Sequence, residues 1–261
     1  MSTPFLDTAR RVILTEADAL RTLADTLDDS VRAAIDLLRD TKGRGIVTGI
    51  GKSGHIANKI AATLASTGTP AQFVHPAEAS HGDLGMITAS DVVLAISNSG
   101  EAPELANLIA YSRRYDIPLI GMTSRPGSSL GSQSDVILTL PALGEACGTG
   151  IVPTTSTTLT LAMGDALAVA LMEHRAFTPE HFRNFHPGGK LGAKLSHVSD
   201  LMHTGDAIPK VDMDASMADA LAQIGEKGFG VTTVTDANGH LAGIITNGDI
   251  TWIRYIYICI P

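Results

Sequence analysis

Residues 49–54, Gly-Ile-Gly-Lys-Ser-Gly, directly follow a short apolar run and could bind an anion. A glycine-rich turn that opens a helix presents backbone N–H groups and the positive end of the helix dipole to a negatively charged group. Gly51 and Ser53 flank Lys52, whose ammonium could stabilise further negative charge. The alternative is a tight strand-to-helix turn with no ligand.

Two nucleotide-binding motifs fit this turn poorly. A Walker A loop ending at Ser53 would need glycine at position 46, where Ile46 stands. The string matches G-x-G-x-x-G, but a dinucleotide fold also needs an acidic residue at the end of the second strand. That strand ends at His75 instead, so the turn favours a small charged substrate over a nucleotide.

Hydroxyl side chains are concentrated at two further turns. The first holds Ser97 and Ser99, with the amide of Asn98 between them, and the second holds Thr154, Thr155, Ser156, Thr157 and Thr158. The second run exceeds what a helix N-cap requires, although a single cap followed by helical threonines is the simpler alternative. Together the two turns predict one phosphate-bearing ligand contacted by several loops.

Two carboxylates and one imidazole could move protons near such a ligand. Glu104 lies in the first turn of a predicted helix, where the dipole should make it the more acidic carboxylate. Glu145 lies in a glycine-rich loop, and His186 precedes a Pro-Gly-Gly turn that would expose its ring. The simpler alternatives are a dipole-complementing acid, a solvated loop carboxylate and a linker histidine.

Metal and thiol chemistry have weaker support. His75, His81 and Asp83 are suitable ligand types, but their spacing matches no specific metal template. Cys147 has no activating motif and is expected to be a small loop residue.

Five apolar runs alternate with helical segments and must position these residues. Each run lacks polar alternation and is therefore predicted to be a strand buried on both faces. The runs are 45–49, 72–75, 92–96, 118–122 and 136–140, with helices expected at 52–66 and 101–115. We expect an α/β fold, a three-layer α/β/α sandwich with a five-stranded parallel sheet, whose ligand site lies beyond the carboxyl ends of the strands.

The N-terminal stretch has a helical apolar stripe formed by Leu20, Ala24, Leu27, Val31, Ala34 and Leu38. This stripe would pack either on its own domain or on a helix of a partner subunit.

Composition narrows the function classes further. The chain has 261 residues, 44% of them hydrophobic, and a net charge of −8 with no basic patch. Nucleic acid and anionic membranes are therefore not expected partners. Two cysteines and the absence of a recognisable signal peptide favour a cytoplasmic protein. The apolar run 159–172 is too short for the roughly 20 residues of a membrane span, and a buried helix is expected.

Four segments closely resemble the arabinose-5-phosphate isomerase family, whose catalytic unit is a sugar isomerase (SIS) domain. They are GKSGHIANKIAATLASTGTPAQFVHPAEASHGDLGMI (51–87), ISNSGE (96–101), TTSTTLTLAMGDALAVAL (154–171) and FHPGGKLG (185–192). Residues 198–250 are similar to a CBS motif, which family members carry in tandem. The resemblance implies interconversion of D-arabinose 5-phosphate and D-ribulose 5-phosphate, the entry step to Kdo, a sugar of lipopolysaccharide.

The family's functional positions fall on Lys52, Glu104, Glu145 and His186. The resemblance also implies substrate contacts near Gly68, Thr69 and His81, and a non-essential, inhibitory zinc at His75. It implies no required cofactor, a phosphosugar ligand and a homotetramer.

Two departures stand out. Gly148 and Thr149 replace a common Pro-Leu pair, and the CBS match stops at Ile250, before an apolar tail at 251–261. The expected organisation is an N-terminal helical segment (1–40), a SIS domain (41–184), a linker with the HPGG turn (185–198) and a single, incomplete CBS motif (199–261).

The expected mechanism moves a proton between C1 and C2 of the open sugar. Glu145 is the first choice of base and Glu104 the second. Lys52 would stabilise the oxyanion, and His186 would assist ring opening, from its own or a neighbouring subunit. Ser97, Ser99 and residues 154–158 would bind the phosphate. The alternatives are a SIS isomerase for another phosphosugar and a non-catalytic phosphosugar sensor.

Overall fold

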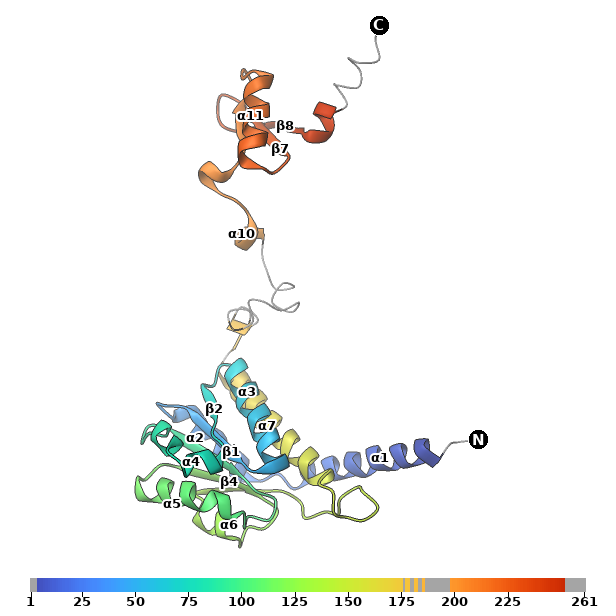
Figure 1. Cartoon of the computed structure of the whole chain (residues 1–261), viewed down its shortest axis with the longest axis vertical. Helices are drawn as coiled ribbons and strands as arrows, with labels where there is room; N and C mark the ends of the chain where they lie inside the picture. Colours follow the sequence, from blue (N-terminus) through green and yellow to red (C-terminus); the bar gives the residue numbers. More distant parts are fainter. Residues whose placement is uncertain (1–3, 176, 179–180, 183–184, 186–197, 252–261) are drawn as a thin grey trace. The chain divides into compact units, whose positions relative to one another are not determined.

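The computed structural model describes every residue except 1–3, 176, 179–180, 183–184, 186–197 and 252–261 (Figure 1). The predictions for His186, for the HPGG turn and for nearly all of the tail lie outside the described residues. Contacts divide the chain into two compact units, Met1–Leu195 and Ser196–Pro261. Each unit is described by itself below.

The first unit is built on a five-stranded parallel sheet in the order β2-β1-β3-β4-β5. The strands are β1 (Gly45–Gly49), β2 (Ala71–Phe73), β3 (Val92–Ile96), β4 (Leu119–Thr123) and β5 (Val136–Thr139). The predicted parallel α/β sheet is therefore confirmed. The chain reverses its direction of winding between β1 and β3, and the turns after these two strands enclose a crevice in folds of this kind.

Helices cover both faces of the sheet, as Figure 1 shows for α3 and α7 on one side and α5 on another. The helices of this unit are α1 (Pro4–Asp25), α2 (Asp29–Asp40), α3 (Gly51–Ser66), α4 (Pro76–Ala79), α5 (Ala106–Arg114), α6 (Ser129–Gln133) and α7 (Thr155–His174), with short 3-10 turns η1 (Asp83–Met86) and η2 (Pro103–Leu105). The segment expected as one helix at 101–115 thus begins as a 3-10 turn.

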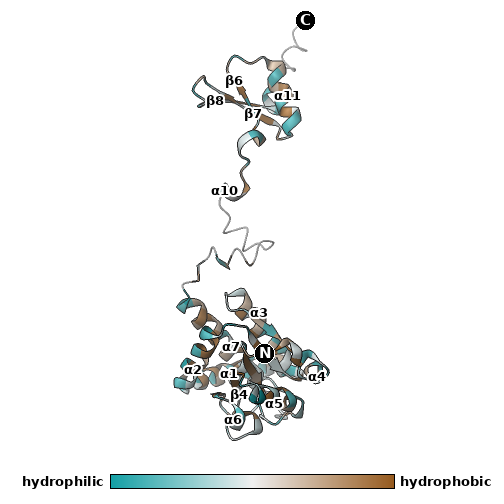
Figure 2. Cartoon of the chain, turned by 90° about the vertical axis from the view of Figure 1, so that its left-hand side faces the viewer, coloured by the Kyte–Doolittle hydropathy of each residue, from teal (hydrophilic) through white to brown (hydrophobic). Residues whose placement is uncertain are grey.

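Neighbouring residues of each strand enter two different cores. Val47 and Ile120 pack with α1, α2, α3 and α7, whereas Ile46 and Leu119 pack with α4, α5 and α6. Successive side chains of a strand point to opposite faces, so an uninterrupted apolar run fills both cores. A helix such as α2 carries apolar and polar residues on different sides (Figure 2).

The N-terminal stripe does not lie on one helix, and this expectation was wrong. The helix breaks after Asp25, and the carboxylate of Asp28 caps α2 by accepting the backbone N–H of Ser30 at 2.9 Å. Leu27 falls in the break and is exposed. Ala19 and Leu23 instead bury the end of α1, while its first half extends beyond the sheet (Figure 1).

Helix α7 has the length and mean hydropathy of a membrane span. Half of its apolar window is nevertheless buried inside the unit, against α1, α2 and α3. A long apolar helix in that position is what the core of an α/β domain requires, and the buried helix expected from the sequence is the one observed.

The second unit contains a three-stranded sheet in the order β6-β7-β8. Its elements are α10 (Val198–Leu201), η3 (Gly205–Ala207), β6 (Lys210–Asp212), α11 (Met217–Lys227), β7 (Val231–Thr235) and β8 (Leu241–Thr246). Strands β7 and β8 form an antiparallel hairpin, and β6 pairs in parallel with β7. Ser216 and Asp219 form a capping box at the start of α11.

Candidate active site

A cavity of about 220 Å³ lies at the carboxyl edge of the sheet, beside the switch between β1 and β3. It is lined by Ile50, Lys52, Ser53, Asn98, Glu145, Pro153, Ser156, Thr157 and Thr160. Lys52 and Ser53 lie in the first turn of α3, Asn98 follows β3, and Ser156 and Thr157 lie in the first turn of α7. Loops that are far apart in the sequence thus meet around one space.

The glycines of the first turn allow its close packing. Gly51 has φ +59°, which favours glycine. A Cβ on Gly54 would lie 2.6 Å from the carbonyl oxygen of Gly49, so α3 approaches the end of β1 too closely for any larger residue. The glycines explain the turn itself, as the alternative interpretation held. The presence of Lys52 among the residues that line the cavity is an additional feature that packing does not require.

Glu145 is fixed by the N-terminus of α7. Its Oε2 accepts the backbone N–H groups of Thr154 at 2.8 Å and Ser156 at 3.2 Å, as well as the hydroxyl of Thr154 at 3.2 Å. Its Oε1 accepts the hydroxyl of Ser156. Burial raises the pKa of Glu145, but these hydrogen bonds, that of the Ser156 hydroxyl above all, outweigh burial and hold the pKa below its usual range. The side chain is therefore an anion whose oxygens have fixed positions.

The hydroxyl run does not face the cavity as a single group. The hydroxyl of Thr157 donates to the carbonyl of Thr154 at 2.8 Å, and that of Thr158 donates to Glu16 on α1 at 3.1 Å. The hydroxyl of Thr155 is buried and has no hydrogen-bond partner in the described part of the chain. Within this run, Ser156 and Thr157 line the cavity and Thr154 supports Glu145.

The turn after β3 is shaped by its own serines. The hydroxyl of Ser97 accepts the N–H of Gly100 at 3.1 Å, and that of Ser99 accepts the N–H of Glu101 at 3.2 Å. Gly100 has φ +70° and closes the turn. Asn98 is the residue of this turn that lines the cavity.

The structure separates other predicted site residues from this cavity. Glu104 is exposed on η2, at the same edge of the sheet, but it does not line the cavity. Gly68 and Thr69 precede β2 and therefore lie at the amino edge, opposite Lys52. The carbonyl of Gly68 accepts a hydrogen bond from Arg175 at 2.9 Å. One copy of the chain does not bring these residues together with Lys52 and Glu145.

The weakly supported metal ligands His75, His81 and Asp83 do not form a metal site within the described residues. Among them, no three His, Cys, Asp or Glu side chains lie close enough to hold a metal ion. His81 is exposed, whereas His75 occupies the N-cap position of α4 without a capping hydrogen bond from its side chain, and its Nδ1 atom is buried without a described hydrogen-bond partner.

Sequence reasoning missed the thiolate character of Cys147. Its hydrogen bonds with the hydroxyl of Thr149 and the backbone N–H of Val152 lower the pKa of Cys147 to about 7. Both partners lie within the loop that carries Glu145. No local motif predicts these hydrogen bonds, because the folding of the loop brings Thr149 and Val152 to the sulfur of Cys147.

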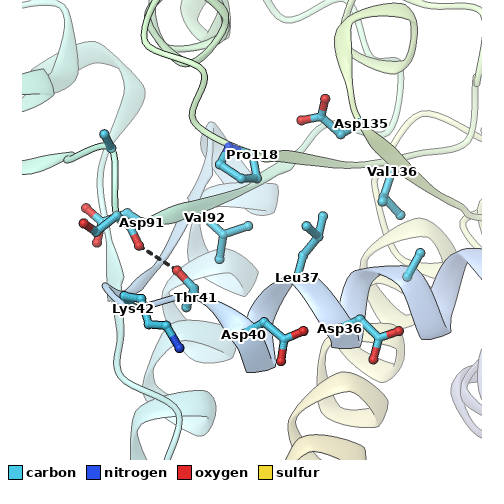
Figure 3. Close-up of a pocket in the computed structure, with 13 residues that line it drawn as sticks. Asp36, Leu37, Asp40, Thr41, Lys42, Asp91, Val92, Pro118, Asp135 and Val136 are labelled. Atoms are coloured by element: carbon cyan, nitrogen blue, oxygen red, sulfur yellow. Dashed lines mark hydrogen bonds between the residues drawn. The ribbon is translucent and has the colours of Figure 1, made fainter.

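A larger cavity of about 780 Å³ lies at the amino edge, between α2 and the beginnings of β3 and β5 (Figure 3). Its acidic groups have structural partners. The side chain of Asp91 is 1% exposed and accepts the N–H groups of Arg44 and Thr88, each at 2.7 Å, while Asp135 forms an ion pair with Arg113. The candidate catalytic residues Lys52 and Glu145 line the smaller cavity instead, at the edge where parallel sheets hold their ligands.

Comparisons with known proteins agree with this geometry. Residues 37–170 match the family model of the SIS domain, and residues 198–253 match that of the CBS domain. The arabinose 5-phosphate isomerase KdsD of Pseudomonas aeruginosa is 51% identical over 247 residues, which are 94% of this chain and 76% of that protein. The enzyme of the same name from Escherichia coli K12 is 49% identical and is covered to 75%.

A solved structure extends the likeness to three dimensions. A protein of E. coli CFT073, determined in complex with arabinose 5-phosphate, superposes with a TM-score of 0.69 and 38% identity. The superposition covers 72% of this chain and all of that protein.

Proposed function

The chain belongs to the arabinose 5-phosphate isomerase family of SIS-domain proteins with a following CBS motif, and we infer from this that it interconverts D-arabinose 5-phosphate and D-ribulose 5-phosphate. This reaction supplies arabinose 5-phosphate to the synthesis of Kdo, a sugar of lipopolysaccharide. The observation that carries the inference is the meeting of Lys52 and the fixed Glu145 carboxylate in one cavity.

We assign the proton transfer to Glu145. In the open-chain aldose the carbonyl is at C1, so removal of the C2 proton leaves an enediolate with negative charge on the oxygen at C1. Delivery of the proton to C1 and relocation of a proton between the two oxygens yields the ketose. The two oxygens of Glu145 are held by Thr154 and Ser156, which fixes the direction from which the base attacks.

Lys52 stabilises the enediolate in this scheme. An ammonium on the wall of a small cavity favours the charge that develops on the sugar oxygens more than it favours the neutral carbonyl. Asn98, Ser53, Ser156 and Thr157 supply further polar groups around the same space. His186 is assigned to ring opening, from its own or a neighbouring subunit, and Glu104 to the sugar hydroxyls. The family pattern adds substrate contacts near Gly68, Thr69 and His81.

The family pattern also suggests how the chain assembles. We propose a cytoplasmic homotetramer that needs no cofactor and that zinc inhibits through His75. Exposed apolar residues on α1, among them Phe5 at 86% exposure, support burial of that helix in an assembly. Light scattering should give the mass of four chains, and a chelator should leave turnover unchanged or raise it.

A direct assay tests the activity. The protein is incubated separately with arabinose 5-phosphate and with glucosamine 6-phosphate, and ketose formation is followed. We expect turnover of arabinose 5-phosphate alone. Turnover of the amino sugar would indicate another SIS reaction, and binding without turnover of either sugar would indicate a phosphosugar sensor.

A further inference from the structure

The side chain of Arg11 links helix α1 to the loop of Glu145 by a hydrogen bond. Nη1 of Arg11 donates a hydrogen bond to the carbonyl oxygen of Ala146 at 2.8 Å. The N–H of Ala146 in turn donates to the hydroxyl of Thr154 at 2.9 Å. Both backbone polar groups of Ala146, the residue next to Glu145, are therefore hydrogen-bonded, and the residue is only 2% exposed.

A second hydrogen bond links α1 to α7, the helix whose N-terminus binds Glu145. Oε2 of Glu16 accepts the hydroxyl of Thr158, one of the first residues of α7, at 3.1 Å. The same face of α1 is packed into the core by Ala19 and Leu23. Helix α1 is thus anchored and bonds to both segments that hold the Glu145 carboxylate.

The rest of the loop has little support of its own. Within the described residues, its other hydrogen bonds join loop residues to one another, as from Gly150 to Cys147 and from Val152 to Cys147, or join Glu145 to the first turn of α7. Among the described hydrogen bonds of the loop, that of Arg11 is the one that comes from α1.

We propose that Arg11 is a positioning residue, which holds the carbonyl of Ala146 so that the neighbouring Glu145 carboxylate stays on the N-terminus of α7. Its role in catalysis rests on the proposed isomerase function, whereas its role in ordering the loop does not. Without the guanidinium, Ala146 is free to move away from Thr154, and Glu145 spends less time on the N–H groups of Thr154 and Ser156. Its carboxylate then titrates closer to the ordinary value.

The test compares Arg11→Ala with Arg10→Ala. Arg10 lies on the same helix, is 71% exposed and pairs with Asp7, so its removal causes the same change of charge without touching the loop. Hydrogen–deuterium exchange of the amides of residues 144–154 reads the loop directly, whether or not the protein is an isomerase. We expect roughly tenfold faster exchange in Arg11→Ala and wild-type exchange in Arg10→Ala.

Kinetics of arabinose 5-phosphate isomerisation give the second readout. In Arg11→Ala we expect kcat to fall roughly three- to tenfold with little change in KM, and the acid limb of the pH profile to move upward. Arg11→Lys keeps a shorter donor and should lie between the wild type and Arg11→Ala.

Unchanged loop exchange in Arg11→Ala, or equal changes in Arg11→Ala and Arg10→Ala, would overturn the proposal. If Arg11→Ala does not fold, the pair Arg11→Lys and Arg10→Lys carries the same comparison, and equal loop exchange in that pair has the same meaning. An inactive wild type whose loop still loosens in Arg11→Ala would refute the isomerase function and leave the ordering role in place.

Discussion

Ser156 binds Glu145 twice, with its backbone N–H on Oε2 at 3.2 Å and its hydroxyl on Oε1. A carboxylate bound in this way sits at the positive end of the α7 dipole and is stabilised as an anion. The sequence suggested such a position for Glu104, at the start of its helix. In the structure Glu145 also lies at the start of a helix, although it belongs to a loop and not to α7, the helix that binds its carboxylate.

Ser156→Ala should raise the pKa of Glu145, because the hydroxyl is the strongest of the contacts that lower it. The active form is the carboxylate, so the acid limb of kcat/KM should move to higher pH. The native pKa is depressed, so the carboxylate stabilises the fold above its unfolded pKa, and this stabilisation is lost as the pH falls through the native pKa. At neutral pH, Ser156→Ala should therefore have a smaller free energy of unfolding than the wild type.

The measurement is a pH–rate profile of Ser156→Ala beside that of Ser132→Ala, which removes an exposed hydroxyl on α6. Superimposed acid limbs for Ser156→Ala and the wild type would show that this hydroxyl does not set the ionisation of the base.

Lys52→Ala and Glu145→Ala should each lower turnover by roughly 10²- to 10⁴-fold, because one removes the stabilising charge and the other the base. Circular dichroism of both variants should match the wild type. The melting temperature of Lys52→Ala should stay close to that of the wild type, whereas Glu145→Ala should melt lower because the hydrogen bonds to Thr154 and Ser156 are lost. Turnover is measured with arabinose 5-phosphate at saturation. A variant that turns over at a near-normal rate removes its residue from the mechanism.

Cys147 should react as a thiolate at neutral pH, because its pKa is lowered to about 7 by Thr149 and Val152. Its alkylation by iodoacetamide should reach half its maximal rate near that pH, against about 8.5 for an ordinary thiol. Mass spectrometry of the labelled peptide follows Cys147 separately from Cys259. Thr149→Val should move the midpoint upward, and an unperturbed midpoint in the wild type would contradict the hydrogen bonds of the loop.

Gly164→Ala and Gly225→Ala should change stability in opposite directions. A Cβ on Gly164 would overlap Ile60 where α7 packs on α3, so this variant should lose about 1–3 kcal/mol of unfolding free energy. Nothing lies near a Cβ on Gly225 in α11, and the replacement should gain about 0.5–1 kcal/mol there. Urea unfolding with amide exchange of each unit measures both effects, and a stabilising Gly164→Ala would refute the close packing of α3 and α7.

Local sequence patterns were enough to predict the strands of the sheet but not the two N-terminal helices. The runs at 45–49 and 92–96 are β1 and β3 as expected, because a strand buried on both faces is apolar at every position. The single helix predicted from the apolar stripe between Leu20 and Leu38 was wrong, because the spacing continues across a break between two helices. Asp28 caps the second of them, α2. Periodicity alone does not distinguish one helix from two with the same phase.

The sequence by itself determined the family, the parallel sheet and the edge of that sheet where Lys52, Asn98 and Glu145 would be found, because motifs and apolar runs are local properties of the chain. Only the tertiary structure decided which of the candidates meet. Gly68 and Thr69 lie at the opposite edge from Lys52, and the hydroxyls of Thr154 and Ser156 bind Glu145. Those partners are set by how α7 packs on the sheet and by Arg11 reaching from α1, and such long-range contacts leave no local pattern in the sequence.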